Sequence, residues 1–162
     1  MGLVIEVREE ILRQVVELRR KQDIRLAAQQ RRSAILGGAA ITLGALISAV
    51  VASPTAKATS GQVIAAGIFA VLLALANGVC WYGVYAAAAK WFDGPDIDKL
   101  TKRFSNRNDG HRALLDHLIA VHNDHHGRNE LAVNSARRIV AIQVIATFVA
   151  LSLLVGALLA LG

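Results

Sequence analysis

The sequence has 162 residues, a formal net charge of +6 and 54% hydrophobic residues, most of which lie in three long blocks separated by charged segments. A soluble domain has about 45–50% apolar residues, glycine included, spread through amphipathic elements, so this segregation excludes an ordinary soluble fold. A single cysteine, Cys80, excludes an internal disulfide.

Residues 1–33 are predicted to form a cytoplasmic amphipathic helix, because they contain no proline and no glycine after Gly2. Apolar residues recur at steps of three and four, at Val4, Val7, Ile11, Val15 and Leu18. The narrow aliphatic stripe favours packing against protein over lying on the membrane surface. With no stop signal before Ala34, the helix is expected to continue into the first apolar block.

Three apolar blocks are predicted to cross a bilayer, over residues 34–53, 62–89 and 139–161. A hydrocarbon core about 30 Å thick needs roughly 20 apolar residues in helical conformation. Helix is expected because lipid offers no hydrogen-bond partner to a free backbone. The fold class is therefore an all-α membrane protein, with a transmembrane hairpin, a C-terminal span and cytoplasmic amphipathic helices.

Rows of small residues at four-residue spacing occur in all three predicted spans, where they allow close helix approach. The rows are Ala40, Gly44 and Ser48; Ala66, Ala70, Ala74 and Gly78; and Ser152, Gly156 and Ala160. They predict a homo-oligomer, with Gly44→Leu or Gly78→Leu impairing assembly. Asn77, an amide at mid-span, is expected to bond to a neighbouring helix.

The segments between the spans contain recognisable turn and cap residues. Residues 54–61 are predicted to be an external loop, with Thr59 or Ser60 as the N-cap of the second span. Residues 90–138 are predicted to be a cytoplasmic linker and helix, with the second helix ending at 93–96 and the new helix beginning near His111. That helix is expected to run into the third span, with Gly127 as a weak point. Its apolar members are Leu114, Leu115, Leu118, Ile119, Val121 and Leu131.

Basic residues predict the orientation in the membrane. Of eighteen Lys and Arg, eight lie in residues 1–33, nine in residues 90–138, and only Lys57 in the loop between the first two spans. Short loops rich in Lys and Arg stay in the cytoplasm. We therefore expect an inner-membrane protein with its N-terminus inside and its C-terminus outside.

The five histidines all lie in residues 111–126, and His122, His126 and Glu130 share one helical face. Histidines four residues apart can bind a divalent metal. Gly127 interrupts the helix there, however, and no HExxH pattern occurs. Solvated histidines are therefore the preferred interpretation, with no metal or other cofactor expected; a pH-sensing role is the alternative.

No phosphate-binding loop, dinucleotide motif or paired catalytic residues occur in the sequence, so an enzyme is not expected. Charges, which ion-coupled transport requires, are absent from the spans. Positive-inside topology explains most of the basic charge, and specific nucleic-acid binding is not predicted. If the signal is anionic, the candidate ligand-binding residues are Arg112, Arg128, Arg137 and Arg138.

The order of elements resembles that of a known family. Gln30-Arg31-Arg32-Ser33-Ala34 leads into a hairpin that is followed by Pro95, and 114–132 leads through Ser135-Ala136-Arg137-Arg138 into the last span. This layout is similar to that of the Pycsar transmembrane effectors of bacterial anti-phage defence. The resemblance implies a protein that responds to a cyclic pyrimidine nucleotide by compromising the inner membrane.

Three functional hypotheses follow from the sequence. The first is an oligomeric membrane effector whose cytoplasmic helices respond to a signal and rearrange the spans. The second is a non-catalytic accessory or scaffold subunit that packs on a larger membrane complex through its small residues. The third is a phage holin or immunity-type membrane protein.

Overall fold

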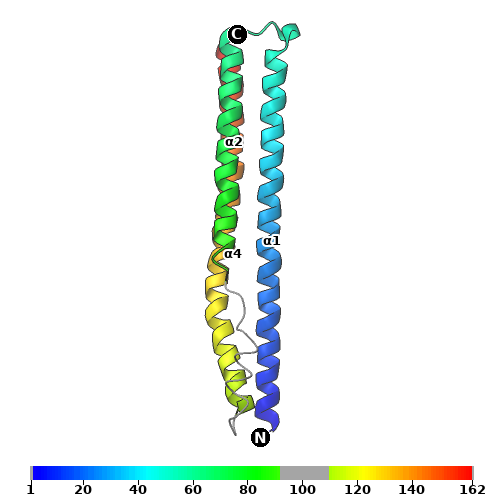
Figure 1. Ribbon diagram of the computed structural model, residues 1–162, viewed down its shortest axis with the longest axis vertical. Helices are drawn as coiled ribbons and strands as arrows, with labels where there is room; N and C mark the ends of the chain where they lie inside the picture. Colours follow the sequence, from blue (N-terminus) through cyan, green and yellow to red (C-terminus); the bar gives the residue numbers. More distant parts are fainter. Residues whose placement is uncertain (1, 92–109, 162) are drawn as a thin grey trace. The chain divides into compact units, whose positions relative to one another are not determined.

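The computed structural model describes the backbone of residues 2–91 and 110–161, and the side chains of residues 9–91 and 111–161. Its elements in chain order are α1 (Gly2–Ala52), the short 3-10 helix η1 (Pro54–Ala56), α2 (Ser60–Ala88) and α4 (Gly110–Ala160) (Figure 1). The described chain is all-helical. The residues 93–96, predicted to end the second helix, lie outside the described residues, but α2 already ends before them, at Ala88.

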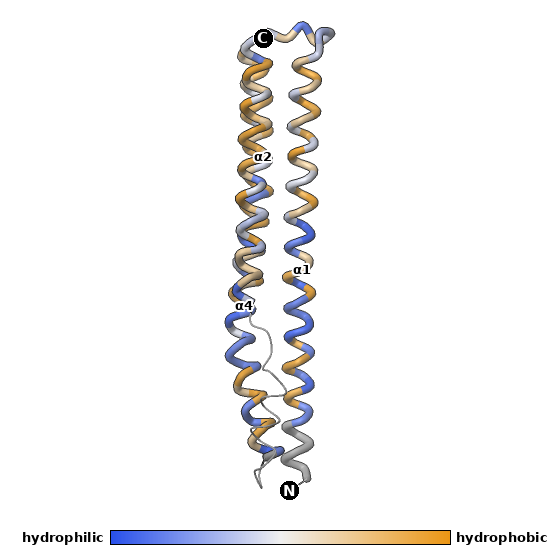
Figure 2. Tube along the Cα trace, in the orientation of Figure 1, coloured by the Kyte–Doolittle hydropathy of each residue, from blue (hydrophilic) through white to orange (hydrophobic). Residues whose placement is uncertain are grey.

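Three of these helices, α1, α2 and α4, are long and apolar enough to cross a membrane. In Figure 2 the N-terminal half of α1 mixes hydrophilic and apolar residues, whereas its C-terminal half has few hydrophilic ones. The predicted continuity is confirmed, because α1 runs without a break past Ala34, and α4 past Arg138. The expectation that Gly127 interrupts α4 is wrong. A helical glycine costs about 1 kcal/mol, and tertiary packing readily overrides such a propensity.

Contacts divide the chain into two units, and both α1 and α4 contribute to each. The polar unit comprises Met1–Ala27 and Ala88–Asn134; the apolar unit comprises Ala28–Ala87 and Ser135–Gly162. Contacts within a protein do not show where lipid begins. The membrane limits given above therefore stay a prediction.

The apolar unit is a three-helix arrangement in which α2 runs opposite to α1 and α4. Gly44 packs against Ala70, while the Ser48 Oγ donates to the Ala66 carbonyl at 3.0 Å. The core consists of Ala40, Phe69, Leu73 and Leu154. The first small-residue row therefore packs within one chain. The third row lies on the outside, since Ser152 and Gly156 are exposed.

A capping box starts α2, and its side chains also bind the end of α4. The Thr59 N–H donates to the Gln62 side chain at 2.8 Å, and the Gln62 N–H donates to the Thr59 hydroxyl at 3.2 Å. Thr59 is thus the N-cap, as the sequence allowed. The same two side chains donate to carbonyls at the end of α4. Gln62 donates to Leu158 at 3.0 Å, and Thr59 donates to Leu161, the residue after α4, at 3.3 Å. These bonds satisfy acceptors that a helix C-terminus leaves open.

In the polar unit, α1 and α4 run in the same direction and contact each other. The His111 Nε2 lies 3.2 Å from the Glu9 carboxylate, and further along the Gln22 Nε2 donates to Glu130 at 3.0 Å. The expected contact between these two helices is present, but the stripe predicted on α1 is displaced. Ile11 and Leu18 are 39% and 47% exposed, whereas Gln22 and Leu26 are buried.

The buried face of each helix follows a seven-residue repeat, which explains this displacement. On α1 the repeat is Leu12, Arg19, Leu26, Ser33, Ala40 and Ile47; on α4 it is Leu115, His122, Asn129, Ala136, Gln143, Ala150 and Ala157. All of these residues are buried or half-buried within their own units. A seven-residue repeat keeps one helical face toward a partner, whatever the chemistry of its members. A search for apolar residues alone passes over its polar positions.

Candidate functional site

A cluster of three neutral polar side chains joins the helices of the apolar unit. The Gln143 Nε2 donates to the Asn77 Oδ1 at 2.9 Å and to the Ser33 carbonyl at 3.1 Å. The Ser33 hydroxyl donates to the Gln143 Oε1 at 2.8 Å, and the Asn77 Nδ2 donates to the Leu73 carbonyl at 2.9 Å. Gln143 is 1% exposed, Ser33 0% and Asn77 3%. Each helix of the unit thus supplies one buried member of this polar cluster.

The polar cluster depends on a close approach between α1 and its neighbours. A Cβ atom added at Gly37 would lie 3.5 Å from the Gln143 Nε2 and 3.9 Å from the Asn77 Cβ. A larger residue at Gly37 would therefore displace the amides. The prediction that Asn77 bonds to a neighbouring helix is confirmed. Its partner Gln143 and the third member Ser33 were missed, although both occupy the seven-residue repeat.

Chemically, the polar cluster is suited to helix packing. Its members are neutral, their hydrogen bonds are mutual, and none of them titrates near neutral pH. Interhelical hydrogen bonds of this type contribute about 0.6 kcal/mol on average and up to about 1.7 kcal/mol in membrane proteins. The cluster therefore fixes which faces of the three helices meet.

A second polar region lies in the polar unit, between α1 and α4. Gln22 is 2% exposed and donates from Nε2 to the His126 carbonyl at 3.3 Å and to Glu130, while Asn129 is 1% exposed. Arg19, His122 and His125 are half-buried on the same face. Leu26 and Leu115 bound this polar seam, which we define as Arg19, Gln22, His122, His125 and Asn129. Polar residues at such positions fix helix register at a cost in stability.

The candidate metal residues do not form a metal site. Within the described residues, no group of three or more His, Cys, Asp and Glu side chains is arranged to hold a metal ion. Glu130 instead accepts from Gln22, with an Arg25 nitrogen 4.0 Å from its carboxylate. His126 is exposed, whereas His122 is half-buried.

The four candidate arginines are divided between the units. Arg112 and Arg128 belong to the polar unit, where sixteen positions of α4, about 24 Å of helix, separate them. One phosphate group cannot contact both. Arg128 is also paired with Asp124 at 3.3 Å. Arg137 and Arg138 are exposed in the apolar unit.

Acid is expected to destabilise the polar unit through His122. Burial lowers the pKa of His122 from its ordinary value of 6.5, and the charges of Arg19 and His125 lower it further. The unfolded chain then binds the proton more readily than the folded chain. The stability contributed by neutral His122 is complete above pH 6.5 and is lost progressively as the pH falls from that value to the lower pKa of the folded chain.

Thermal unfolding of the protein in mild detergent, followed by circular dichroism at pH 8 and pH 5.5, measures this effect. The midpoint should fall at the lower pH, and His122→Gln should reduce the fall. The matched control is His126→Gln, which replaces an exposed ring on the same helix. An unchanged pH dependence in His122→Gln would contradict the assignment.

These features define a class: an all-helical protein with three helices able to span a membrane, held by a neutral polar cluster. Comparison with family models, with curated proteins and with solved structures found no match to this chain.

Proposed function

We propose that this protein is a non-catalytic, oligomeric effector of the bacterial inner membrane, in which the polar unit responds to a signal and the apolar unit changes its packing. The observation that supports this proposal is that α1 and α4 each contribute to both units as uninterrupted helices. When such a helix rotates about its axis in one unit, its side chains in the other unit rotate with it. The packing of the polar unit and that of the spans are therefore coupled.

The composition of the two units favours a response that begins in the polar unit. Its seam contains buried or half-buried Arg, Gln, His and Asn side chains, which specify register but pack weakly. The apolar unit has an apolar core and mutual hydrogen bonds. A ligand, or a second copy, that alters the weaker seam therefore needs less binding energy than one that acts on the spans.

Exposed apolar side chains of the polar unit support the oligomer. Ile11 and Leu18 lie seven residues apart on one face of α1, and both are exposed within one chain. Outside lipid, leaving apolar surface in water instead of burying it costs a free energy of roughly 25 cal/mol per Å². A second copy that packs against this face of α1 would remove that cost.

The double variant Ile11→Asp with Leu18→Asp tests assembly and function together. Both residues are exposed in one chain, so the fold should persist while the oligomer dissociates. Cross-linking in membranes measures assembly, and a potential-sensitive dye in cells measures membrane integrity. The control is Ile24→Asp, which places the same charge at an exposed isoleucine about 120° around α1 from Leu18.

The signal is proposed from the family resemblance to be a cyclic pyrimidine nucleotide, acting in anti-phage defence. Co-expression of an enzyme that makes this nucleotide should depolarise cells that contain the wild-type chain, and not cells that contain the double variant. Depolarisation that survives the loss of assembly would contradict the oligomeric mechanism. No depolarisation, together with stoichiometric co-purification of other membrane proteins, would favour the accessory-subunit function.

The proposed orientation has the polar unit in the cytoplasm and the C-terminus outside. Enzyme reporters fused after residue 162 test it, one active only in the cytoplasm and one only in the periplasm. We expect the periplasmic reporter alone to be active, because Lys57 is the only basic residue of the predicted external loop. Fusions at the N-terminus serve as the control with the opposite result. Cytoplasmic activity after residue 162 would refute the proposed topology.

A further inference from the structure

A recess of about 250 Å³ opens between α1 and α2 in the apolar unit. Three glycines, Gly37, Gly38 and Gly78, contribute to its lining, together with Ala34, Ile41, Trp81 and one polar side chain, Asn77. A Cβ atom added at Gly38 or at Gly78 would meet no other atom within 4 Å. The recess therefore lies on the outer surface of the three helices, where lipid is expected. Its lining is mostly apolar, because the Asn77 amide is already hydrogen-bonded within the polar cluster.

An arginine lies on the same face of α1, one turn from the recess. Positions 31, 34, 38 and 41 follow the steps of three and four that place residues on one side of a helix. Arg31 is exposed, and in the part of the chain that the structure describes it has no hydrogen-bond or ion-pair partner. A positive charge that has no partner among the described residues thus adjoins the recess.

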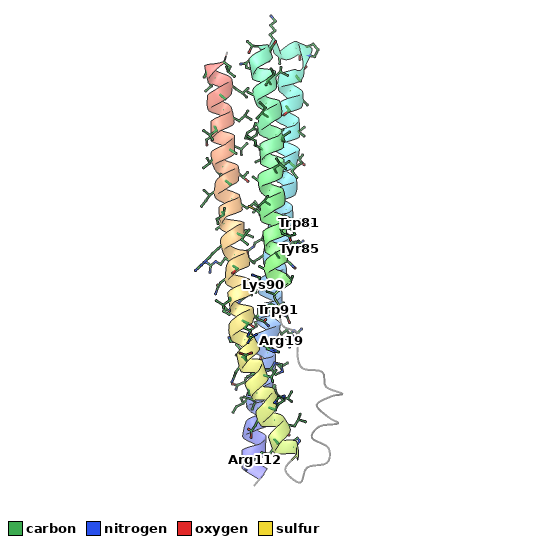
Figure 3. The ribbon with its side chains drawn as sticks, turned by 60° about the vertical axis from the view of Figure 1, so that its left-hand side comes forward. Arg19, Trp81, Tyr85, Lys90, Trp91 and Arg112 are labelled. Carbon is green, nitrogen blue, oxygen red and sulfur yellow. The ribbon has the colours of Figure 1, made fainter. Side chains whose placement is uncertain are left out.

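Two aromatic side chains lie on the α2 side of this region. Trp81 lines the recess, and Tyr85 follows one turn later toward the C-terminal end of α2 (Figure 3). Their ring centroids are 4.6 Å apart, and Trp81 is 45% exposed. Indole and phenol rings prefer the headgroup level of a bilayer, where an apolar body meets a polar edge. The order from apolar recess to aromatic ring to free cation follows the order of groups along a phospholipid.

We propose that Arg31, the recess and the Trp81–Tyr85 pair form a binding site for an anionic phospholipid. An acyl chain occupies the recess, the phosphate pairs with the Arg31 guanidinium, and the aromatic rings flank the region between them. Basic residues beside grooves between spans bind anionic headgroups in this way. A nucleotide fits poorly, because the recess is apolar and smaller than ligand pockets of roughly 300–1,000 Å³.

The charge of Arg31 also decides against a second copy as the occupant. A two-fold contact is made by the same surface on both copies. With both copies inserted in one direction, such a contact through the recess would bring the two Arg31 side chains to one level. Like charges would then meet without compensation. An anionic lipid, in contrast, neutralises Arg31.

Quenching of Trp81 fluorescence by brominated lipids tests the proposal. The chain has two tryptophans, so the substitution Trp91→Phe leaves Trp81 as the only reporter. The full-length variant is reconstituted into phosphatidylcholine bilayers with a rising fraction of phosphatidylglycerol or of phosphatidylcholine that carries bromine on its acyl chains. Half-maximal quenching should need about five-fold less phosphatidylglycerol, since one arginine near the headgroups contributes about 1 kcal/mol.

Three variants locate the site within the apolar unit. Arg31→Gln should abolish the preference for phosphatidylglycerol. The control is Arg32→Gln, which removes the same charge one position further along α1, about 100° around the helix, and should keep the preference. Gly78→Leu should fill the recess and weaken quenching by both brominated lipids.

Three results would overturn the proposal. Equal quenching by the two lipids would show that no site selective for the anionic lipid exists. Loss of the preference on adding millimolar inorganic phosphate would show that Arg31 binds soluble phosphate instead. Shielding of Trp81 from both lipids, with disulfide-linked dimers formed by Gly78→Cys in a Cys80→Ala background, would replace the lipid by a second copy.

Discussion

Replacing Gln143 with leucine is expected to lower the free energy of unfolding by about 1–3 kcal/mol, because it leaves the Ser33 hydroxyl and the Asn77 carbonyl oxygen without their partner. Leucine is similar in size and apolar, so the effect isolates the hydrogen bonds. The polar cluster joins α1, α2 and α4, and its loss should loosen all three helices together. Unfolding in mixed detergent micelles, followed by circular dichroism, measures the change.

The matched control for this prediction is Ser152→Ala. Ser152 is exposed on the same helix, and its hydroxyl donates only to the Phe148 carbonyl one turn away at 3.0 Å. Its removal should change the unfolding free energy by less than about 0.5 kcal/mol, as expected for a surface position. Equal effects of Gln143→Leu and Ser152→Ala would show that the polar cluster does not stabilise the unit.

Leucine at Gly44 and leucine at Gly78 are expected to have different effects, although the sequence predicts impaired assembly for both. A Cβ atom at Gly44 already lies 3.4 Å from the Leu73 side chain and 3.5 Å from the Ala70 Cα. The remaining atoms of a leucine must push α1 away from α2. Overpacking of this kind costs about 1–3 kcal/mol, and separation would also break the bond from Ser48 to Ala66. Gly44→Leu should therefore destabilise the single chain.

Gly78→Leu meets open space and should leave the stability of the single chain unchanged. Measuring the thermal midpoint and the amount of cross-linked oligomer for each variant separates a loss of single-chain stability from a loss of assembly. A Gly44→Ala variant serves as the control, because its added carbon is at ordinary contact distance and should be tolerated. A stable Gly44→Leu chain that fails to assemble would restore the original prediction and refute the intrachain role of Gly44.

The number of apolar helices and their uninterrupted length were determined by the sequence alone. Each apolar block is long enough to cross a bilayer, and no proline or turn signal separates Arg32 from Ala34 or Arg138 from Val140. The preference of an apolar segment for lipid, and its need to form its backbone hydrogen bonds within itself, are local properties, so a single sequence reveals them. The hydrogen-bonding role of Asn77 is of the same kind, since it follows from the chemistry of one residue in its place along a helix. For the N-cap of α2 the sequence allowed Thr59 or Ser60, and the structure selected Thr59.

Only the tertiary structure decided which residues meet. The sequence did not distinguish Gly44, packed between α1 and α2, from Gly78, which faces a recess, because both are small residues at four-residue spacing. It did not join Ser33 to Gln143, which are 110 positions apart. Nor did it place Gln22 inside the polar unit and Ile11 outside, because apolar periodicity ignores polar members of a seven-residue repeat. Helix rotation is fixed by the sum of contacts with neighbouring helices, and those contacts exist only once the chain has folded.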